Sequence, residues 1–164
     1  MMRARKEEQI MYTPDFETFT KMAREGNLIP VYREIIADTE TPVTALMKLA
    51  QSPHLFLLES VEGGEKWGRY SFLGTDIMAL FRVQGREIVI EENGAVRRSP
   101  HGGDPLRRLK ELLGRYRPVH VEGLPRFFGG AVGFLGYDMV RYFEKLPAAG
   151  DGLPADDAIF MKTD

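Results

Sequence analysis

The sequence predicts an α+β fold, a largely antiparallel sheet with flanking helices. Short apolar runs suited to strands are joined by glycine-containing turns, and Asn93-Gly94 is the strongest hairpin signal among them. Strands and helices do not alternate regularly, as they would in a parallel βαβ fold. Between the apolar runs lie three patterns typical of a helix start, in which proline follows a capping residue: Thr13-Pro14, Thr41-Pro42 and Asp104-Pro105.

Composition excludes several classes of function. The chain has 164 residues, a net charge of −2 and no cysteine. A nucleic-acid partner is therefore not expected, and neither are disulfides or thiolate metal sites. No apolar run approaches the length of a membrane span, and the first ten residues lack the apolar core of a secretory signal. We expect no membrane partner and a cytoplasmic location.

The first part of the chain is predicted to be a charged, flexible lead-in over residues 1–12. A helix is expected to begin at Thr13-Pro14 and to stop at Gly26. Leu28 to Ile36 is predicted as a strand, because Val31 and Tyr32 favour a pleated surface. The second helix is predicted to begin at Thr41-Pro42.

The rest of the chain contains more strands than helices. A helix is expected after Asp104-Pro105, and a shorter one over Asp138 to Leu146 with Val140 and Phe143 pointing inward. A strand is expected to begin at Ala158, with nothing after it to pair with it. Strands are also expected over 54–58, 71–73, 77–83, 87–91, 95–98 and 127–135.

The stretch from His54 to Gly74 has the pattern strand, polar loop, strand, in which a rigid scaffold presents a small-molecule site. Glu59 and Ser60 follow the first strand, and the loop carries Lys66 and the single tryptophan, Trp67. From the residues alone, the simplest interpretation is structural: a strand-end hydroxyl and carboxylate satisfy nearby backbone amides. A large ring at a loop base is likewise more often core than ligand site.

Several motifs in this order resemble the N-terminal domain of anthranilate synthase component I, of the chorismate-utilising enzymes. Two of them lie in the central stretch: Leu57-Leu58-Glu59-Ser60 and the run from Glu65 to Ser71. Ile29 to Tyr32 precedes them, and Phe128-Gly129-Gly130 and Gly136-Tyr137-Asp138 follow. The resemblance covers nearly the whole chain and implies one such domain over residues 13–164.

The resemblance implies a regulatory role in an enzyme that forms anthranilate and pyruvate from chorismate and ammonia. In that family the LLES segment lines a pocket for tryptophan, the feedback inhibitor. The resemblance therefore assigns Leu58, Glu59 and Ser60 to the inhibitor site, and Lys66 is a further candidate for the inhibitor's carboxylate. The binding of an amino acid requires acceptors for its ammonium group, which strand-end carbonyls and hydroxyls supply.

The resemblance also implies partners that this chain does not contain. A C-terminal domain of the same protein would bind chorismate and Mg²⁺ and would carry the catalytic residues. A glutamine amidotransferase subunit, component II, would supply the ammonia. These 164 residues are therefore expected to be inactive alone, without a cofactor, a metal site or catalytic residues of their own.

Two other functions stay open. One is the related aminodeoxychorismate synthase component of folate synthesis, and the other is a stand-alone amino-acid-binding module. The sequence offers little for catalysis: its three histidines lie far apart, and no GxSxG serine motif is present. Asp156-Asp157 is expected to be solvated, because adjacent strand residues point to opposite faces.

Overall fold

The computed structural model describes residues 12–60, 70–146 and 156–163 of the chain. These residues form two compact units. The first consists of the described part of Met1–Asp38 together with Tyr116–Pro125, and the second contains the remainder. Apart from Tyr12, the predicted lead-in lies outside the described residues. The assignment of residues 13–164 to a single domain stays a prediction.

The first unit contains one helix, α1 (Phe16–Met22), among its described residues. Its N-cap is Asp15, whose carboxylate accepts a hydrogen bond from the Thr18 amide at 2.8 Å. The predicted start at Thr13-Pro14 is therefore wrong. The Thr13 amide instead donates to the Tyr32 carbonyl at 2.8 Å, and the Tyr32 amide donates back to Thr13.

Two further predictions for this unit are wrong. Leu28 to Ile36 is not a strand, since among the described residues it makes only isolated bridges, Thr13 with Tyr32 and Leu28 with Pro118. It finds no continuous partner strand there, so its β propensity has nothing to pair with. Gly26 does not end the helix, which closes at Met22. It permits a close approach instead, because a Cβ there would lie 2.2 Å from the Arg117 carbonyl oxygen.

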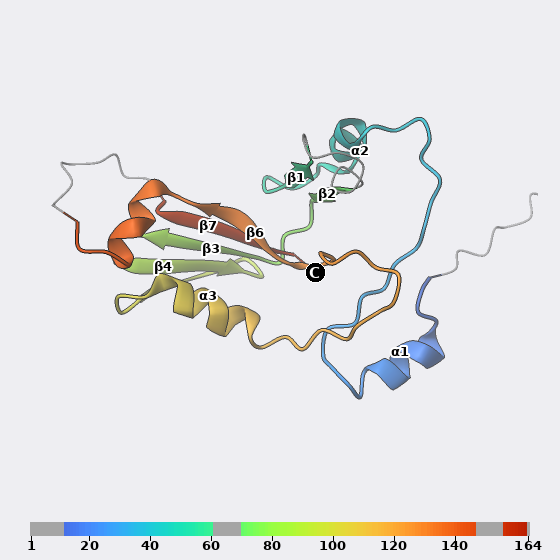
Figure 1. Ribbon diagram of the computed structural model, residues 1–164, viewed down its shortest axis with the longest axis horizontal. Coiled ribbons are helices and arrows are strands. Elements are labelled where there is room, and N and C mark those ends of the chain that lie inside the picture. The colour runs from blue at the N-terminus through green and yellow to red at the C-terminus, as the bar shows by residue number, and fades with distance from the viewer. Residues whose placement is uncertain (1–11, 61–69, 147–155, 164) are drawn as a thin grey trace, which may run out of the picture. The chain divides into compact units, whose positions relative to one another are not determined.

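The second unit confirms the α+β class with a largely antiparallel sheet (Figure 1). Five strands follow the order β5-β4-β3-β7-β6, and every neighbouring pair is antiparallel. Their bounds are β3 (Ala79–Gln84), β4 (Glu87–Glu92), β5 (Ala95–Pro100), β6 (Gly130–Leu135) and β7 (Ala158–Thr163).

The last strand, β7, has partners on both sides, contrary to the prediction. It pairs with β3 through Phe160↔Phe81 and with β6 through Ile159↔Phe134. Both partners precede β7 in the sequence, so the strand needs no later segment to pair with. The expectation of an unpaired strand was wrong because sheet neighbours distant in sequence leave no local signal.

The β4–β5 hairpin confirms the Asn93-Gly94 prediction. Both turn residues have positive φ, 52° and 74°, as a two-residue type I′ turn requires. The turn fixes the register, in which Glu92 lies opposite Ala95.

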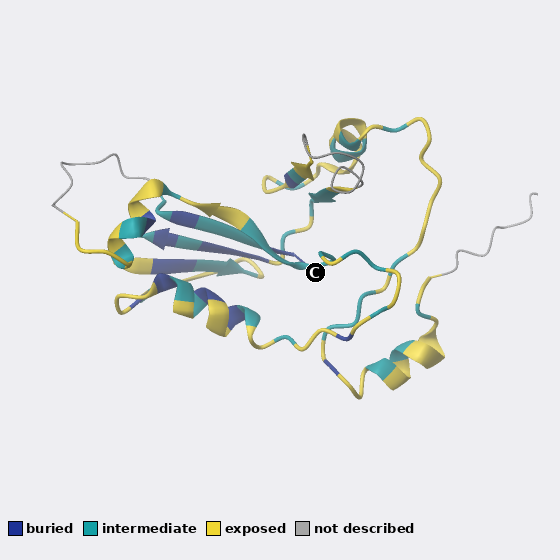
Figure 2. Cartoon of the chain, viewed as in Figure 1, coloured by how far each residue is buried: buried dark blue, intermediate teal, exposed yellow. Residues whose placement is uncertain are grey.

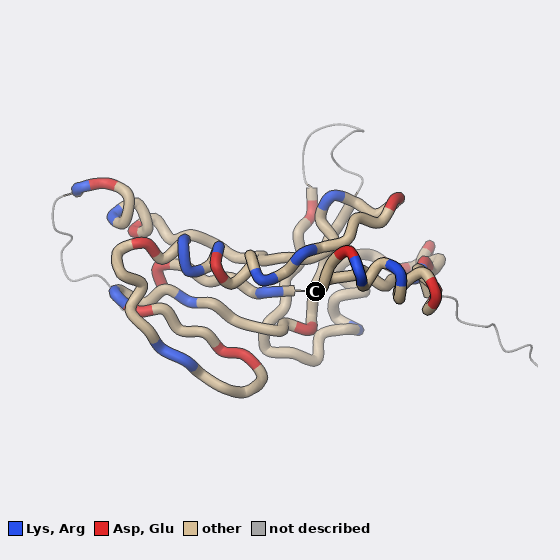
Figure 3. The backbone as a smooth tube through the Cα atoms, turned by 90° about the horizontal axis from the view of Figure 1, so that it is seen from below, with Lys and Arg blue, Asp and Glu red and all other residues tan. Residues whose placement is uncertain are grey.

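Basic and acidic residues are interspersed along the described chain (Figure 3). The basic residues of the following helix are part of this pattern, and Arg107 and Arg108 both pair with Glu111.

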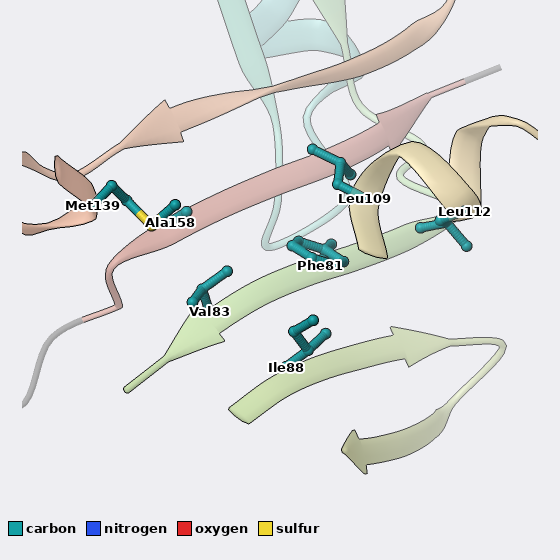
Figure 4. Packing of buried hydrophobic residues seen from close by; sticks show 7 residues of the cluster. All are labelled: Phe81, Val83, Ile88, Leu109, Leu112, Met139 and Ala158. Atoms are coloured by element: carbon teal, nitrogen blue, oxygen red, sulfur yellow. The ribbon is translucent and has the colours of Figure 1, made fainter. Parts of the chain in front are cut away.

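One face of the sheet packs against α3 (Pro105–Leu113), whose N-cap is Asp104 as predicted. Leu109 and Leu112 of this helix belong to the same buried cluster as Phe81 of β3 (Figure 4). Burial of a leucine side chain stabilises a fold by about 1.5–3 kcal/mol. The buried cluster comprises Phe81, Val83, Ile88, Leu109, Leu112, Met139 and Ala158.

A 3-10 helix, η1 (Tyr137–Tyr142), lies where a short helix over Asp138 to Leu146 was predicted. Its buried residue is Met139, at 3% exposure, whereas Phe143 is 58% exposed. The prediction that Phe143 points inward is therefore wrong. The tighter 3-10 winding changes which residues face the core.

The smaller sheet is the hairpin of β1 (Phe56–Glu59) and β2 (Ser71–Gly74). Helix α2 (Pro42–Leu49) contacts both strands. As predicted, α2 begins at Thr41-Pro42, where Thr41 and Thr44 cap each other's backbone amides at 3.1 and 2.8 Å. Burial is highest in the central strands of the large sheet, and α2 is half-buried or exposed (Figure 2).

Candidate functional site

The β1–β2 hairpin carries the residues that the sequence assigned to a ligand site. Leu58 and Glu59 are the last two residues of β1, and Ser60 follows directly. All three side chains are exposed, and Leu58 is 44% exposed. Lys66 and Trp67 lie outside the described residues, so the contribution of Lys66 stays a prediction.

The side chains of Leu58 and Glu59 leave the hairpin on opposite faces. Leu58 lies opposite Phe72 and Glu59 lies opposite Ser71. Cross-strand partners share a face of an antiparallel pair, and successive residues alternate between faces. A ligand that contacts both residues from one side must therefore use the main chain of one of them.

Phe56 and Gly74 occupy the same face as Leu58, two pairs further along the hairpin. The Phe56 ring lies so close that a Cβ on residue 74 would be 2.4 Å from its Cε1 atom. Real Cβ atoms do not approach another atom so closely. The Phe56 ring can therefore occupy this position only because residue 74 is glycine. The Phe56 side chain is 8% exposed.

A pocket of about 320 Å³ lies beside this face. Phe127, from the segment before β6, meets Phe72 edge-on, with ring centroids 5.4 Å apart. Phe128 and Gly129 also line the pocket, together with Phe56. The structure thus joins the LLES hairpin to the Phe-Gly-Gly segment, two motifs about 70 positions apart in the sequence.

Polar groups of Thr75, Asp76 and Thr163 complete the lining of this pocket. Among the described residues, the Asp76 carboxylate has no ion pair and no hydrogen bond. An aromatic wall and a free carboxylate suit a ligand that carries both a ring and an ammonium group. Sequence reasoning did not single out Phe56, Phe72 or Asp76. The signal for Phe56 was present in the alternation that places it on the same face as Leu58.

Both ring nitrogens of His101 are hydrogen-bonded within the fold. Its side chain is buried, its Nδ1 accepts the Gly103 amide at 2.9 Å, and its Nε2 lies 3.0 Å from the Gly85 carbonyl oxygen. Because Nδ1 accepts this hydrogen bond, Nε2 is the nitrogen that donates to the Gly85 carbonyl. Both ring nitrogens are therefore used to hold the β3–β4 turn and the loop before α3.

The same corner contains Tyr142, whose hydroxyl lies 2.9 Å from the Asp157 carboxylate and 2.5 Å from the Gly85 carbonyl oxygen. Burial raises the pKa of Tyr142 to about 12, helped by the hydrogen bond to Asp157 and by its negative charge. The phenol therefore stays neutral and serves as a donor. This arrangement links η1 to the end of β3.

Asp156 and Asp157 are hydrogen-bonded, contrary to the prediction that they are simply solvated. Asp156 accepts from the Gln84 side-chain amide at 2.7 Å, and Asp157 accepts from the Gly85 backbone amide at 3.0 Å. The carboxylates cap the β3–β4 turn. Over residues 12–60, 70–146 and 156–163, no group of three or more His, Cys, Asp and Glu side chains is placed to hold a metal ion.

No helix in the described part of the chain is both long enough and apolar enough to cross a membrane. No protein-family model matches the chain. Similarity to curated proteins is nevertheless extensive, and three relatives illustrate it.

A protein of Acetivibrio thermocellus is 40% identical over 158 residues, and one of Synechocystis is 44% identical over 158 residues. Both alignments cover 94% of this chain and 31% of the relative. A Pseudomonas aeruginosa protein is 43% identical over 152 residues, or 90% of this chain and 31% of the relative. All three are named anthranilate synthase component 1. The chain is thus similar to anthranilate synthase component 1 over 90–94% of its own length, and it spans about a third of the length of these relatives.

Proposed function

We propose that this chain is the N-terminal regulatory part of an anthranilate synthase component 1. The whole protein would convert chorismate and ammonia to anthranilate and pyruvate in tryptophan biosynthesis, and a component II amidotransferase would release the ammonia from glutamine. The observation that carries this proposal is the identity of 40–44% over 90–94% of the chain with proteins of that name.

Catalysis is assigned to the part of such a protein that this chain does not span. The Mg²⁺ that the resemblance implies would be bound with chorismate in that part. Its role is to bind an effector and to pack against the catalytic domain of the same protein.

The effector we propose is tryptophan, bound at the end of β1 by Leu58, Glu59, Ser60 and Lys66. The Leu58 side chain offers exposed apolar surface for an indole ring, and the Ser60 hydroxyl offers an acceptor for an ammonium group. Because Glu59 points to the other face, its main chain is the group we expect to contact the ligand beside Leu58. Lys66 would meet the carboxylate.

Inhibition would operate through differential affinity. Tryptophan must bind the inactive arrangement of the two domains more tightly than the active one. A tenfold shift of that equilibrium requires about 1.4 kcal/mol of differential binding. One buried side chain or one charge-assisted hydrogen bond can supply a difference in binding free energy of this size.

The test uses the native polypeptide that carries this sequence, supplied with chorismate, Mg²⁺ and ammonia. Anthranilate is followed by its fluorescence, with and without tryptophan. Anthranilate formation that tryptophan suppresses would support both parts of the proposal. A product that a lyase then converts to 4-aminobenzoate would assign the protein to folate synthesis instead.

A stand-alone amino-acid-binding module is the second candidate. It is favoured by the aromatic pocket and by the Asp76 carboxylate, which is unpaired among the described residues. Calorimetric titration of the 164-residue chain with tryptophan separates the two functions. Binding at micromolar or lower concentration, lost in Asp76→Asn, would favour the module. Millimolar binding or none would favour the shared site, because half a pocket leaves much of the ligand in water.

A further inference from the structure

Strand β6 forms one edge of the five-stranded sheet. It pairs with β7 along all six of its residues, and no strand in the described part of the chain pairs with its other side (Figure 1). The opposite edge is β5. The two edge strands differ in their content of charged residues and proline.

The backbone groups that face outward from β6 follow from its register. The Gly136 amide donates to the Asp157 carbonyl at 2.7 Å, and the pairing continues as Leu135↔Ala158 and Phe134↔Ile159. In an antiparallel ladder, hydrogen-bonded and non-hydrogen-bonded pairs alternate. Val132 and Phe134 therefore bond to β7. The N–H and C=O groups that point away from the sheet are those of Ala131, Gly133 and Leu135.

This edge lacks the features that normally prevent pairing with another strand. Its sequence, Gly-Ala-Val-Gly-Phe-Leu, contains no charge and no proline, and its last three residues are exposed. Phe134 is 53% exposed and Leu135 is 49% exposed. The other edge, β5, carries Arg97, Arg98 and Pro100. Charges and proline are the usual protection of a free edge, so β5 is built as an end of the sheet and β6 is not.

We propose that the open edge of β6 is completed by a further β-strand from the part of anthranilate synthase component 1 that this chain does not span. The inference rests on the proposed function, since it requires a longer polypeptide. The incoming strand is uncharged where it faces Val132 and Phe134. It receives backbone hydrogen bonds from Ala131, Gly133 and Leu135.

The size of the contact favours the same polypeptide over a second copy of the chain. The edge is six residues long, whereas a stable interface between separate proteins buries roughly 1,200–2,000 Å². A strand of the same polypeptide pairs at an effective concentration near the millimolar range and needs no large interface. The relatives extend well beyond the matched region, since the matched residues cover 31% of each.

Residue-resolved amide hydrogen exchange tests the proposal in both the 164-residue chain and the native polypeptide. In the short chain, the amides of Ala131, Gly133 and Leu135 should exchange at least about tenfold faster than those of Val132 and Phe134. In the native polypeptide, the outward amides should slow to the level of their neighbours. Outward amides that stay fast there would overturn the proposal, and so would protection in the short chain that rises with concentration, because that indicates a second copy.

Proline variants give a second, matched measurement. Leu135→Pro removes an outward amide, so the short chain should keep its midpoint of unfolding, whereas the native polypeptide should lose protection along β6. Phe134→Pro removes a bond to β7 and should destabilise both. Equal effects of Leu135→Pro in both would count against the added strand. The same samples are also assayed for anthranilate formation. If the native polypeptide forms anthranilate but its outward amides still exchange fast, the added strand is refuted and the proposed function is not.

Discussion

The ring of Phe56 on β1 occupies the space that a side chain on Gly74 of β2 would need. A Cβ at residue 74 would lie 2.4 Å from the ring's Cε1 and 2.7 Å from its Cζ. The two residues are direct cross-strand partners, and the ring lines the pocket beside the hairpin. The absence of a side chain at one position therefore determines the wall of the candidate site.

Gly74→Ala should displace the Phe56 ring and lower the free energy of unfolding by about 1–3 kcal/mol, the usual cost of overpacking. Urea denaturation measures the change. Phe56→Leu provides the control, because a smaller side chain leaves room for the methyl group. In that background the cost of Gly74→Ala should fall by at least about 0.5 kcal/mol. Additive costs would show that the ring is not what excludes a side chain at residue 74.

Tyr142→Phe should lower stability at pH 8 by about 1 kcal/mol, the net contribution of one hydrogen bond. The pKa of Tyr142 is raised from 10.0 to about 12 in the folded chain, so its contribution is present in full below pH 10. It is lost as the pH rises through about 12. The difference between wild type and Tyr142→Phe should therefore shrink above pH 10.

Denaturation midpoints measured from pH 8 to pH 12 test this pH dependence. Tyr137→Phe serves as the matched control, because its ring is exposed and the same substitution there should change stability little at any pH. A difference between wild type and Tyr142→Phe that stays constant to pH 12 would contradict the assignment of the hydroxyl as a donor to the Asp157 and Gly85 corner.

Leu112→Ala should destabilise the second unit by about 2–5 kcal/mol, because Leu112 is 3% exposed and packs with Phe81. The neighbouring Lys110 is exposed, and Lys110→Ala should change stability by no more than about 0.5 kcal/mol. Thermal unfolding monitored by circular dichroism compares them. A similar small effect of both would mean that α3 does not pack on the sheet as described.

Local signals predicted much of the fold. Asn93-Gly94 and the starts of α2 and α3 were predicted correctly, because turn and capping preferences depend on a few adjacent residues. The strand over Leu28 to Ile36 and the pairing of β7 were predicted wrongly. Both depend on which distant segment lies alongside, and β7 finds its partners about 25 and 80 positions earlier in the chain.

The candidate site shows the same division. Sequence placed Leu58 and Glu59 at the end of a strand, and the structure confirms that position. It did not predict the contact of Phe72 with Phe127, which joins segments 55 positions apart and depends on the tertiary fold. Nor did it predict that Asp76 lines the same pocket.

The substitution Ser60→Phe in the native polypeptide tests whether the end of β1 binds tryptophan. Ser71→Phe is the matched control: Ser71 is also an exposed serine on this hairpin, opposite Glu59 on the face away from Leu58. We predict that Ser60→Phe raises the tryptophan concentration for half-inhibition at least about tenfold, a loss of about 1.4 kcal/mol. Ser71→Phe should change it less than about threefold, with anthranilate formation intact in both. Unchanged inhibition of Ser60→Phe would contradict the claim.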